Sequence, residues 1–465
     1  MDVSSTSGAP ASLSPAATTP SRFTSWPAGW PFVALFAGYP LWWALGLGQF
    51  AFWVFALPMA LHLWRRKRAG LLRLPPGFTL WALFLVWSVA GLALLGLTPP
   101  GALPGSAGLA GALVRVLTYL ALTVLLLYVG NLSRAEFSDG AVARALGWLC
   151  LATVAGGLLG TFAPYFEFTA PLELLLPGPL ARDPYLQTLI HPAAAQVMDV
   201  LGYEAPRPKA PWEYTNSWGN NLSLLVIWLV IGWVCRGRGW RRWTACLALA
   251  LSVVPIVYSL NRGLWVGLAL SILFALVQLA RRGRIVEVGL CCLAGLLAAG
   301  ALLLSPLMGI VEDRAANPHS DDGRAVASAA AVRAAMDSPV IGWGSTREAL
   351  GSGTSIAIGK SPECPQCGNH VIGNNGQLWL LLIANGWVGT AFFLGFFAQA
   401  VWRHRFDVSL VGSGALLTVL LLFWYMFFYV ALTAPLALSL TAVALLWRRS
   451  TPAPGAVATP EGVGR

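Results

Sequence analysis

Residues 236–284 read RGRGWRRWTACLALALSVVPIVYSLNRGLWVGLALSILFALVQLARRGR, and the rest of the chain repeats their pattern. Two apolar runs, 244–260 and 264–280, are each about as long as a helix needs to cross a hydrocarbon core of about 30 Å. Arginine clusters flank this pair, and the turn Asn261-Arg262-Gly263 joins its two runs. Basic residues beside a span stay in the cytoplasm, so the stretch predicts a helical hairpin whose turn faces outward.

Apolar runs alternate with short loops along the whole chain, and every second loop carries a basic cluster. Of the 465 residues, 57% are hydrophobic and 11% charged, and the mean hydropathy is +0.67, which favours one lipid-embedded bundle over soluble domains. The sequence therefore predicts an all-α, polytopic membrane helix bundle with about 12 transmembrane helices. The predicted spans are 30–47, 48–64, 78–97, 111–130, 146–166, 218–235, 244–260, 264–280, 285–304, 376–401, 409–430 and 433–447.

An even number of spans places both termini in the cytoplasm of a multi-pass protein, which we expect in the plasma (inner) membrane. With these spans, 20 of the 30 Lys and Arg residues lie inside, and the outer loops hold 13 acidic residues against 9 basic ones. The net charge of +11 is therefore a property of the cytoplasmic side, explained by an anionic leaflet without any nucleic acid partner.

The polar parts of the chain divide it into regions. Residues 1–25 and 450–465 are rich in small residues and proline, and we expect both to be disordered and cytoplasmic. The bundle spans residues 26–449, with two long outer loops at about 167–217 and 305–375. Chemistry is expected in these loops, because they hold most of the polar groups outside the cytoplasm.

The first outer loop is rich in proline, which argues against long helices, and it leads into a span through Asn216, Asn220 and Asn221. Its Trp and Tyr residues fit an interfacial aromatic belt. Such a belt does not account for three amides on a helix that enters lipid, since amides there need partners. The alternative is that they line a cavity.

The second outer loop contains a predicted helix that begins near Asp321-Asp322 and stops before Pro339. Arg324 and Arg333 lie nine residues apart and therefore point to opposite sides of it. Arg324 shares its side with Ser328, Ala331 and Ala335, small residues that allow close packing.

Two further features of the outer side have competing interpretations. Cys364 and Cys367 could form a disulfide at the tip of a loop, the reading we favour over a zinc or thioredoxin-type site. Arg262 either extends to the membrane interface or matches an anion such as phosphate, which a planar guanidinium binds well.

Four segments in order resemble the O-antigen ligase and polymerase family of bacterial membrane glycosyltransferases, over about residues 205–400. They are Tyr214-Thr215-Asn216 entering a span, Ser259-Leu260-Asn261-Arg262-Gly263 between two spans, Asp322-Gly323-Arg324 followed by residues 338–344, and Asn374-Asn375-Gly376-Gln377 leading to residues 385–389. The resemblance implies a GT-C-like fold, and it implies that Arg262, Arg324, Arg333, Asn216, Asn375 and Gln377 bind substrate.

One position departs from the family pattern. The position of the histidine that acts at the acceptor hydroxyl in the family is taken by Asn375 here, and the nearest histidine is His370. Either His370 reaches the same place, or another group has this role, or the chemistry differs.

The resemblance implies transfer of a glycan from a polyprenyl-pyrophosphate carrier to a hydroxyl of a glycan, lipid or protein acceptor outside the membrane. Arg262 and Arg324 would clamp the pyrophosphate, and His370 would be the base. We expect no metal and no cofactor, because no Asp-x-Asp or His cluster is present. The alternatives are a transporter or flippase of lipid-linked sugars or small anions, and a scaffold for envelope assembly. The sequence does not separate a ligase from a polymerase.

Overall fold

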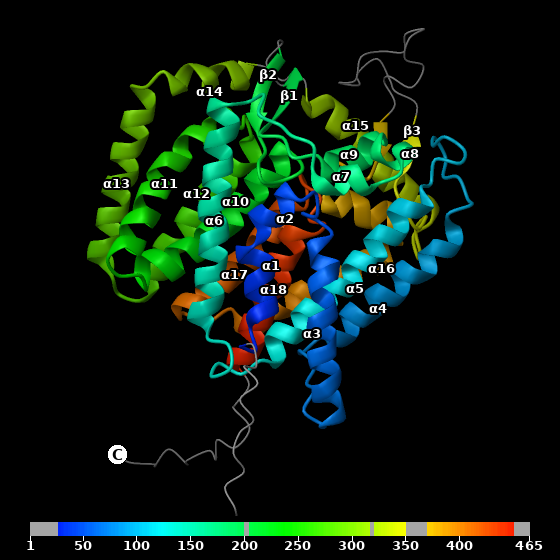
Figure 1. Cartoon of the computed structure of the whole chain (residues 1–465), viewed down its shortest axis with the longest axis horizontal. Helices are drawn as coiled ribbons and strands as arrows, with labels where there is room; N and C mark the ends of the chain where they lie inside the picture. The colour runs from blue at the N-terminus through cyan, green and yellow to red at the C-terminus, as the bar shows by residue number, and fades with distance from the viewer. Residues whose placement is uncertain (1–26, 200–203, 317–319, 350–369, 451–465) are drawn as a thin grey trace, which may run out of the picture.

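The computed structural model describes residues 27–199, 204–316, 320–349 and 370–450, which form a helical bundle with two small antiparallel hairpins (Figure 1). In chain order the elements are α1 (Trp30–Ala37), α2 (Tyr39–Ala44), α3 (Ala51–Arg68), α4 (Phe78–Ala90), η1 (Gly91–Leu94), α5 (Leu109–Asn131), α6 (Asp139–Phe162), α7 (Pro171–Leu175), α8 (Gly178–Ala181), α9 (Pro184–Ile190), β1 (Ala195–Asp199), β2 (Glu204–Pro208), α10 (Thr215–Leu229), the π-helical η2 (Val230–Cys235), α11 (Trp240–Tyr258), α12 (Arg262–Arg281), α13 (Ile285–Leu303), α14 (Leu307–Ala316), α15 (Ser320–Asp337), β3 (Arg347–Ala349), β4 (His370–Ile372), α16 (Gln377–His404), α17 (Leu410–Tyr425) and α18 (Ala434–Ser450).

The helical bundle agrees with the predicted fold class. Among the described residues, six helices are both long and apolar enough to cross a membrane: Leu109–Asn131, Asp139–Phe162, Thr215–Cys235, Trp240–Tyr258, Arg262–Arg281 and Gln377–His404. Shorter apolar helices cover 78–94, 285–301 and 410–425. The first predicted span, 30–47, is divided into α1 and α2 at Gly38, and the total of about 12 spans remains a prediction.

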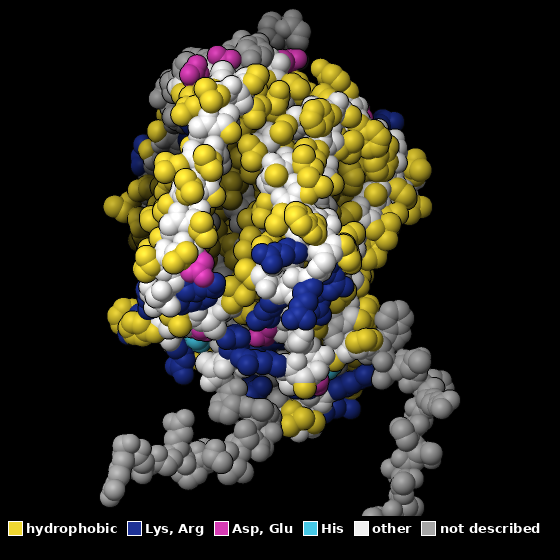
Figure 2. Space-filling model, turned by 90° about the vertical axis from the view of Figure 1, so that its left-hand side faces the viewer, with side chains coloured by type: hydrophobic (Ala, Val, Ile, Leu, Met, Phe, Trp, Pro, Cys, Tyr) yellow, Lys and Arg dark blue, Asp and Glu magenta, His cyan; other side chains and the backbone are white. Residues whose placement is uncertain are grey.

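The core of the bundle lies around α10, α17 and α18. Every residue of α18 from Ala434 to Arg448 is buried, and it packs against α5 and α17. In contrast, α11, α12 and α13 leave many Leu, Val and Ile side chains exposed, as expected for helices that face lipid. Figure 2 shows apolar side chains covering much of this face above a band of Lys and Arg.

The two ends of the bundle differ in charge and structure. We call the end with the arginine clusters the basic end; both ends of the described chain lie there, since the Tyr128 hydroxyl donates to Ala28 O and Ser450 contacts His404. The opposite end, the loop end, carries α7, α8, α9, both hairpins, α14 and α15 (Figure 1). In the described part of the first loop the helices are the short α7, α8 and α9, which agrees with the prediction that this proline-rich loop contains no long helix.

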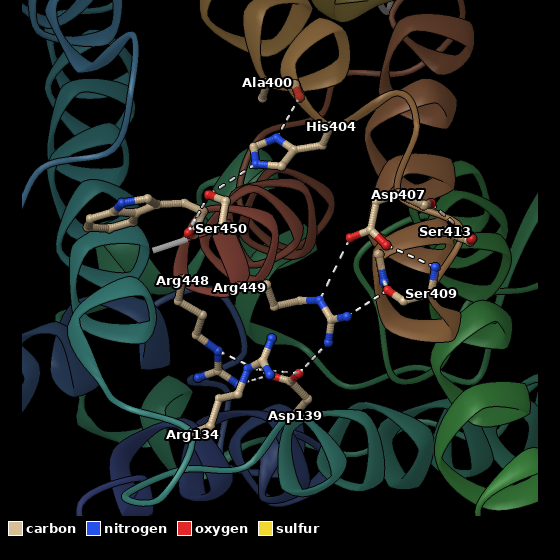
Figure 3. A network of polar contacts seen from close by, with 12 residues as sticks. Arg134, Asp139, Ala400, His404, Asp407, Ser409, Ser413, Arg448, Arg449 and Ser450 are labelled. Carbon is tan, nitrogen blue, oxygen red and sulfur yellow. Dashed lines mark hydrogen bonds and ion pairs between the residues drawn. The ribbon is translucent and has the colours of Figure 1, made fainter. Parts of the chain in front are cut away.

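A buried ion network closes the basic end (Figure 3). Asp139 accepts hydrogen bonds from Arg448 at 2.6 Å and from Arg449 at 2.8 Å, and Arg449 also donates to Ser409 Oγ at 2.6 Å. These contacts join the start of α6, the start of α17 and the end of α18. Helix α6 begins at Asp139, before the span predicted from residue 146, and Ser138 caps this start by accepting a hydrogen bond from Ala141 N–H at 3.1 Å.

Helix α16 is broken at Gly386, whose φ of 64° and ψ of −171° are not helical. The turn formed by residues 338–344 enters this break. Trp343 N–H donates to Ile383 O at 2.7 Å, Gly344 N–H to Ala384 O at 2.9 Å, and Trp387 N–H to Pro339 O at 2.8 Å. The turn therefore supplies partners for backbone groups that the break leaves without helical ones.

Candidate functional site

The loop end contains an open cleft of about 500 Å³ that combines one cation with aromatic walls. It is lined by Arg324, Ala325, Ser328, Trp379, Trp424, Phe427 and Phe428. The indole N–H of Trp379 donates to Phe427 O at 3.0 Å, which fixes two of the aromatic walls against each other. We call this space the aromatic cleft.

Helix α15 positions Arg324 at the cleft through its small-residue side. Ala331 and Ala335 are fully buried, as the sequence predicts, so α15 approaches α16 closely. Asn375 Nδ2 donates to Arg324 O at 3.2 Å and to Ser328 Oγ at 2.8 Å. The side chain of Asn375 therefore attaches α15 to the segment that precedes α16.

The turn before Arg262 is strained and is held by two arginines from other segments. Leu260 has a φ of 53°, a left-handed conformation that is unusual for a branched residue. Arg207 Nε, from β2, donates to Ser259 O at 2.6 Å, and Arg314 Nε, from α14, donates to Leu260 O at 3.2 Å. Arg262 then occupies the first position of α12.

Two aromatic side chains connect this turn to the aromatic cleft. The Trp424 indole, which lines the cleft, donates to Gly263 O at 3.4 Å. The Tyr429 hydroxyl bonds to Asn261 Oδ1, and the same oxygen caps α12 by accepting from Leu264 N–H at 3.1 Å. The residues on either side of Arg262 thus contact elements that line or border the space next to Arg324.

Positive charge accumulates around Tyr429. Burial, together with the nearby charges of Arg314 and Arg324, lowers the pKa of Arg207 to about 10. The charges of Arg324 and Arg207 both act on the Tyr429 hydroxyl. Arg324 forms no ion pair with any carboxylate that the structure describes. An anionic ligand would therefore be attracted to this part of the loop end.

The other sequence-predicted binding residues have different surroundings. Asn216 Oδ1 accepts from Arg207 Nη2 at 3.4 Å, so Asn216 lies beside the arginine that holds the turn. Arg333 is exposed, away from the buried alanine side of α15, and does not line the aromatic cleft. Gln377 is fully buried, accepts from Ala431 N–H at 3.0 Å, and does not line the cleft either.

The remaining predictions concern the disulfide, His370 and metal binding. Cys364 and Cys367 lie outside the described residues, so the disulfide stays a prediction. The backbone of His370 belongs to β4 and pairs with Ala349 in β3, while the placement of its side chain is not described. In the described part of the chain, no group of three or more His, Cys, Asp or Glu could hold a metal ion.

Several residues around the cleft were not singled out from the sequence. Arg207 lies between two prolines, which indicates an extended segment but gives no sign of a partner in the hairpin turn. Arg314 follows two acidic residues and resembles an ordinary exposed charge. Trp379, Trp424 and Tyr429 resemble an interfacial aromatic belt. Only their arrangement in space distinguishes them, because they come from four separate segments.

Comparison with protein-family models and with curated protein sequences finds no match for this chain.

Proposed function

We propose that the protein is a membrane glycosyltransferase that moves a glycan from a polyprenyl-pyrophosphate carrier to an acceptor hydroxyl on the outer face of the membrane. The observation that carries this proposal is the aromatic cleft, where the Arg324 guanidinium stands beside four aromatic side chains. A ligand that suits this combination has an anionic head and an apolar tail. A polyprenyl pyrophosphate has both.

In this reaction the site must chiefly stabilise the departing polyprenyl pyrophosphate, because the pyrophosphate already activates the lipid-linked glycan for transfer. The acceptor oxygen attacks the anomeric carbon, the bond from that carbon to the pyrophosphate oxygen breaks, and the hydroxyl proton passes to a base. Polyprenyl pyrophosphate leaves with an additional negative charge. Fixed guanidinium groups in a site of low dielectric constant stabilise that charge as it develops.

We assign the leaving-group contacts to Arg324 and Arg262. In this scheme Arg207 and Arg314 act as positioning residues, because their hydrogen bonds to Ser259 O and Leu260 O hold the turn from which Arg262 projects. His370 is proposed as the acceptor-side base on the family resemblance alone, and the substrate-binding role of Asn375 and Asn216 is proposed on the same ground.

The test is glycan transfer by purified protein in detergent, supplied with a lipid-linked donor and an acceptor. Arg324→Ala is expected to reduce transfer by at least about 100-fold, the range observed when one charge-stabilising donor is removed from an active site. Arg182→Ala is the matched control: Arg182 is an exposed arginine at the end of α8, outside the cleft. It should transfer at the normal rate.

A lysine at position 324 separates charge from geometry. Arg324→Lys keeps the positive charge but loses the planar fork that binds two phosphate oxygens, so partial activity is expected. Near-normal transfer by folded Arg324→Ala protein would contradict the assignment.

The transporter alternative is tested by the same assay, because transport needs a sealed compartment and transfer in detergent does not. Helix α16 is broken, as helices of transporters often are at their binding sites. In this chain, however, the break is filled by the backbone of residues 338–344 instead of opening into a cavity, which favours a structural role for the break.

A further inference from the structure

A second group of polar side chains lies outside the aromatic cleft, on the first half of α5 and at the start of α16. Arg115 is in the second turn of α5, and its Nε and Nη1 atoms are buried without a hydrogen-bond partner among the described residues. It forms no ion pair with a described carboxylate. Arg115 as a whole is half-buried, and among the described residues its Nε and Nη1 lack the anionic or carbonyl partner that an arginine in a membrane span normally has.

Two more hydrogen-bonding groups accompany Arg115. Tyr119, one helical turn further along α5, is 1% exposed, and its hydroxyl meets full hydrogen-bond geometry with no group that the structure describes. Gln377 lies beside it and is fully buried, but the two side chains do not meet hydrogen-bond geometry. Because Gln377 Oε1 accepts from Ala431 N–H, the Gln377 atom without a partner in the described part of the chain is the amide nitrogen Nε2, which can only donate.

The guanidinium of Arg347 adds a second positive charge near the donor groups of Arg115, Tyr119 and Gln377. Arg347 in β3 is 1% exposed and is held by hydrogen bonds to several carbonyl oxygens, including Trp343 O at 2.8 Å and Leu97 O at 3.2 Å. Burial lowers the pKa of Arg347, and the positive charge of Arg115 lowers it further, so the two guanidinium groups repel each other. An anion bound near both groups would relieve this repulsion.

We propose that Arg115, Tyr119 and Gln377 form a second anion site at the loop end, with Arg347 contributing charge. The ligand is a phosphate or carboxylate group, because the charged N–H groups of a guanidinium form charge-assisted hydrogen bonds with the oxygens of such groups. None of these residues lines the aromatic cleft, and the site does not depend on the proposed function. The anion can come from a lipid headgroup in the outer leaflet or from a soluble molecule.

The test uses the full chain in phosphatidylcholine nanodiscs, with the thermal unfolding midpoint followed by tryptophan fluorescence. One arm adds inorganic phosphate, compared with chloride at equal ionic strength to remove simple screening. The other arm introduces phosphatidylglycerol into the nanodisc. A ligand that binds only the folded state raises the midpoint. A response to phosphate indicates a soluble anion, and a response to phosphatidylglycerol indicates a lipid headgroup.

Two variants identify the site. Arg115→Gln should weaken the apparent affinity for the responding anion by about tenfold or more, as expected for loss of a charge-assisted contact. Gln377→Glu keeps the acceptor that Ala431 N–H requires and places a carboxylate beside Arg115, so it should abolish the response while the protein stays folded. If Arg115→Gln does not fold, the Gln377→Glu variant alone tests whether the anion binds at this site.

The matched control is Arg182→Gln, which removes an exposed arginine of the same end and should respond like the parent protein. The proposal is overturned if neither anion raises the midpoint of the parent protein. It is equally overturned if folded Gln377→Glu protein responds as strongly as the parent.

Discussion

Glu213 is an acidic side chain that sits among aromatic groups at the loop end, directly before the helix that carries Asn216. The Tyr39 hydroxyl donates to Glu213 Oε1 at 3.4 Å, and Trp212 and His191 lie around the same small space. Burial raises the pKa of Glu213 above its ordinary value, with Lys209 acting in the opposite direction. Its carboxyl group therefore holds a proton more tightly in the folded protein than in the unfolded chain.

This shift predicts a pH dependence of stability. Because the folded pKa is raised, the contribution of Glu213 is fully present below the unfolded pKa of about 4.3 and is lost as the pH rises through the folded value. Glu213→Gln keeps the acceptor for Tyr39 and removes the titration. We expect the midpoint of thermal unfolding to fall less between pH 4.5 and pH 8 in this variant than in the parent. An identical fall in both proteins would contradict the prediction.

At the level of single residues, the sequence predicted some of the candidate site and missed the rest. Arg324 and its small-residue side follow from helical spacing, which is a local property. Arg207 and Arg314 could not be found in this way, because their partners Ser259 and Leu260 are distant in the chain and are contacted through backbone oxygens. Every residue has a backbone carbonyl oxygen, so the residue types in the sequence do not indicate which carbonyl group an arginine will contact.

At the scale of elements, α16 and the turn at residues 338–344 depend on each other. A Cβ atom on Gly386 would lie 2.7 Å from Pro339 O and 2.9 Å from Gly342 N, and the φ of 64° disfavours any side chain. Backbone atoms cannot move away here without breaking the hydrogen bonds that fill the break.

Gly386→Ala is therefore expected to destabilise the protein by more than about 2 kcal/mol, since strain and a steric clash add. The control is Gly395→Ala on the same helix, where the new Cβ meets only the tip of Leu80 at 3.3 Å. Thermal unfolding in detergent compares the two. Similar midpoints for both variants would show that the turn does not constrain Gly386.

The boundaries of an element could be predicted where hydropathy alone determines them. They were harder to predict where ion pairs, caps or backbone contacts determine them. The hairpin of α11 and α12 has bounds close to the predicted runs, because apolar length decides both. Helix α6 extends beyond the predicted span at its start, where Ser138 caps the helix and Asp139 pairs with Arg448 and Arg449 from the far end of the chain. The hairpin pairing of β1 with β2 was not predicted, as prolines dominate that loop.

At the scale of the whole molecule, Asp139 links three segments of the chain at the basic end. Asp139 is only 8% exposed and pairs with Arg448 and Arg449. Its removal would leave a buried guanidinium without its carboxylate, which is destabilising by about 3–5 kcal/mol in such pairs. Asp139→Asn should therefore lower the unfolding midpoint substantially.

Glu287→Gln provides the comparison, because Glu287 pairs with Arg284 within one helix turn at an exposed position. Such surface pairs contribute little, so its midpoint should not change. If the two variants unfold at the same temperature, the network around Asp139 is not what closes the basic end.

Helix α18 is enclosed on all sides, yet it is the last of the described helices to leave the ribosome. Chains grow from the N-terminus, so the earlier helices enter the bilayer before their central partner exists. Until α18 is inserted, the earlier helices are loosely packed. The position that α18 later takes is occupied by lipid or by the other helices. The bundle is therefore completed only when α18 is inserted, after all the other described helices. A nascent chain stalled before Ala434 should be recognisable by its sensitivity to protease, since its centre is missing.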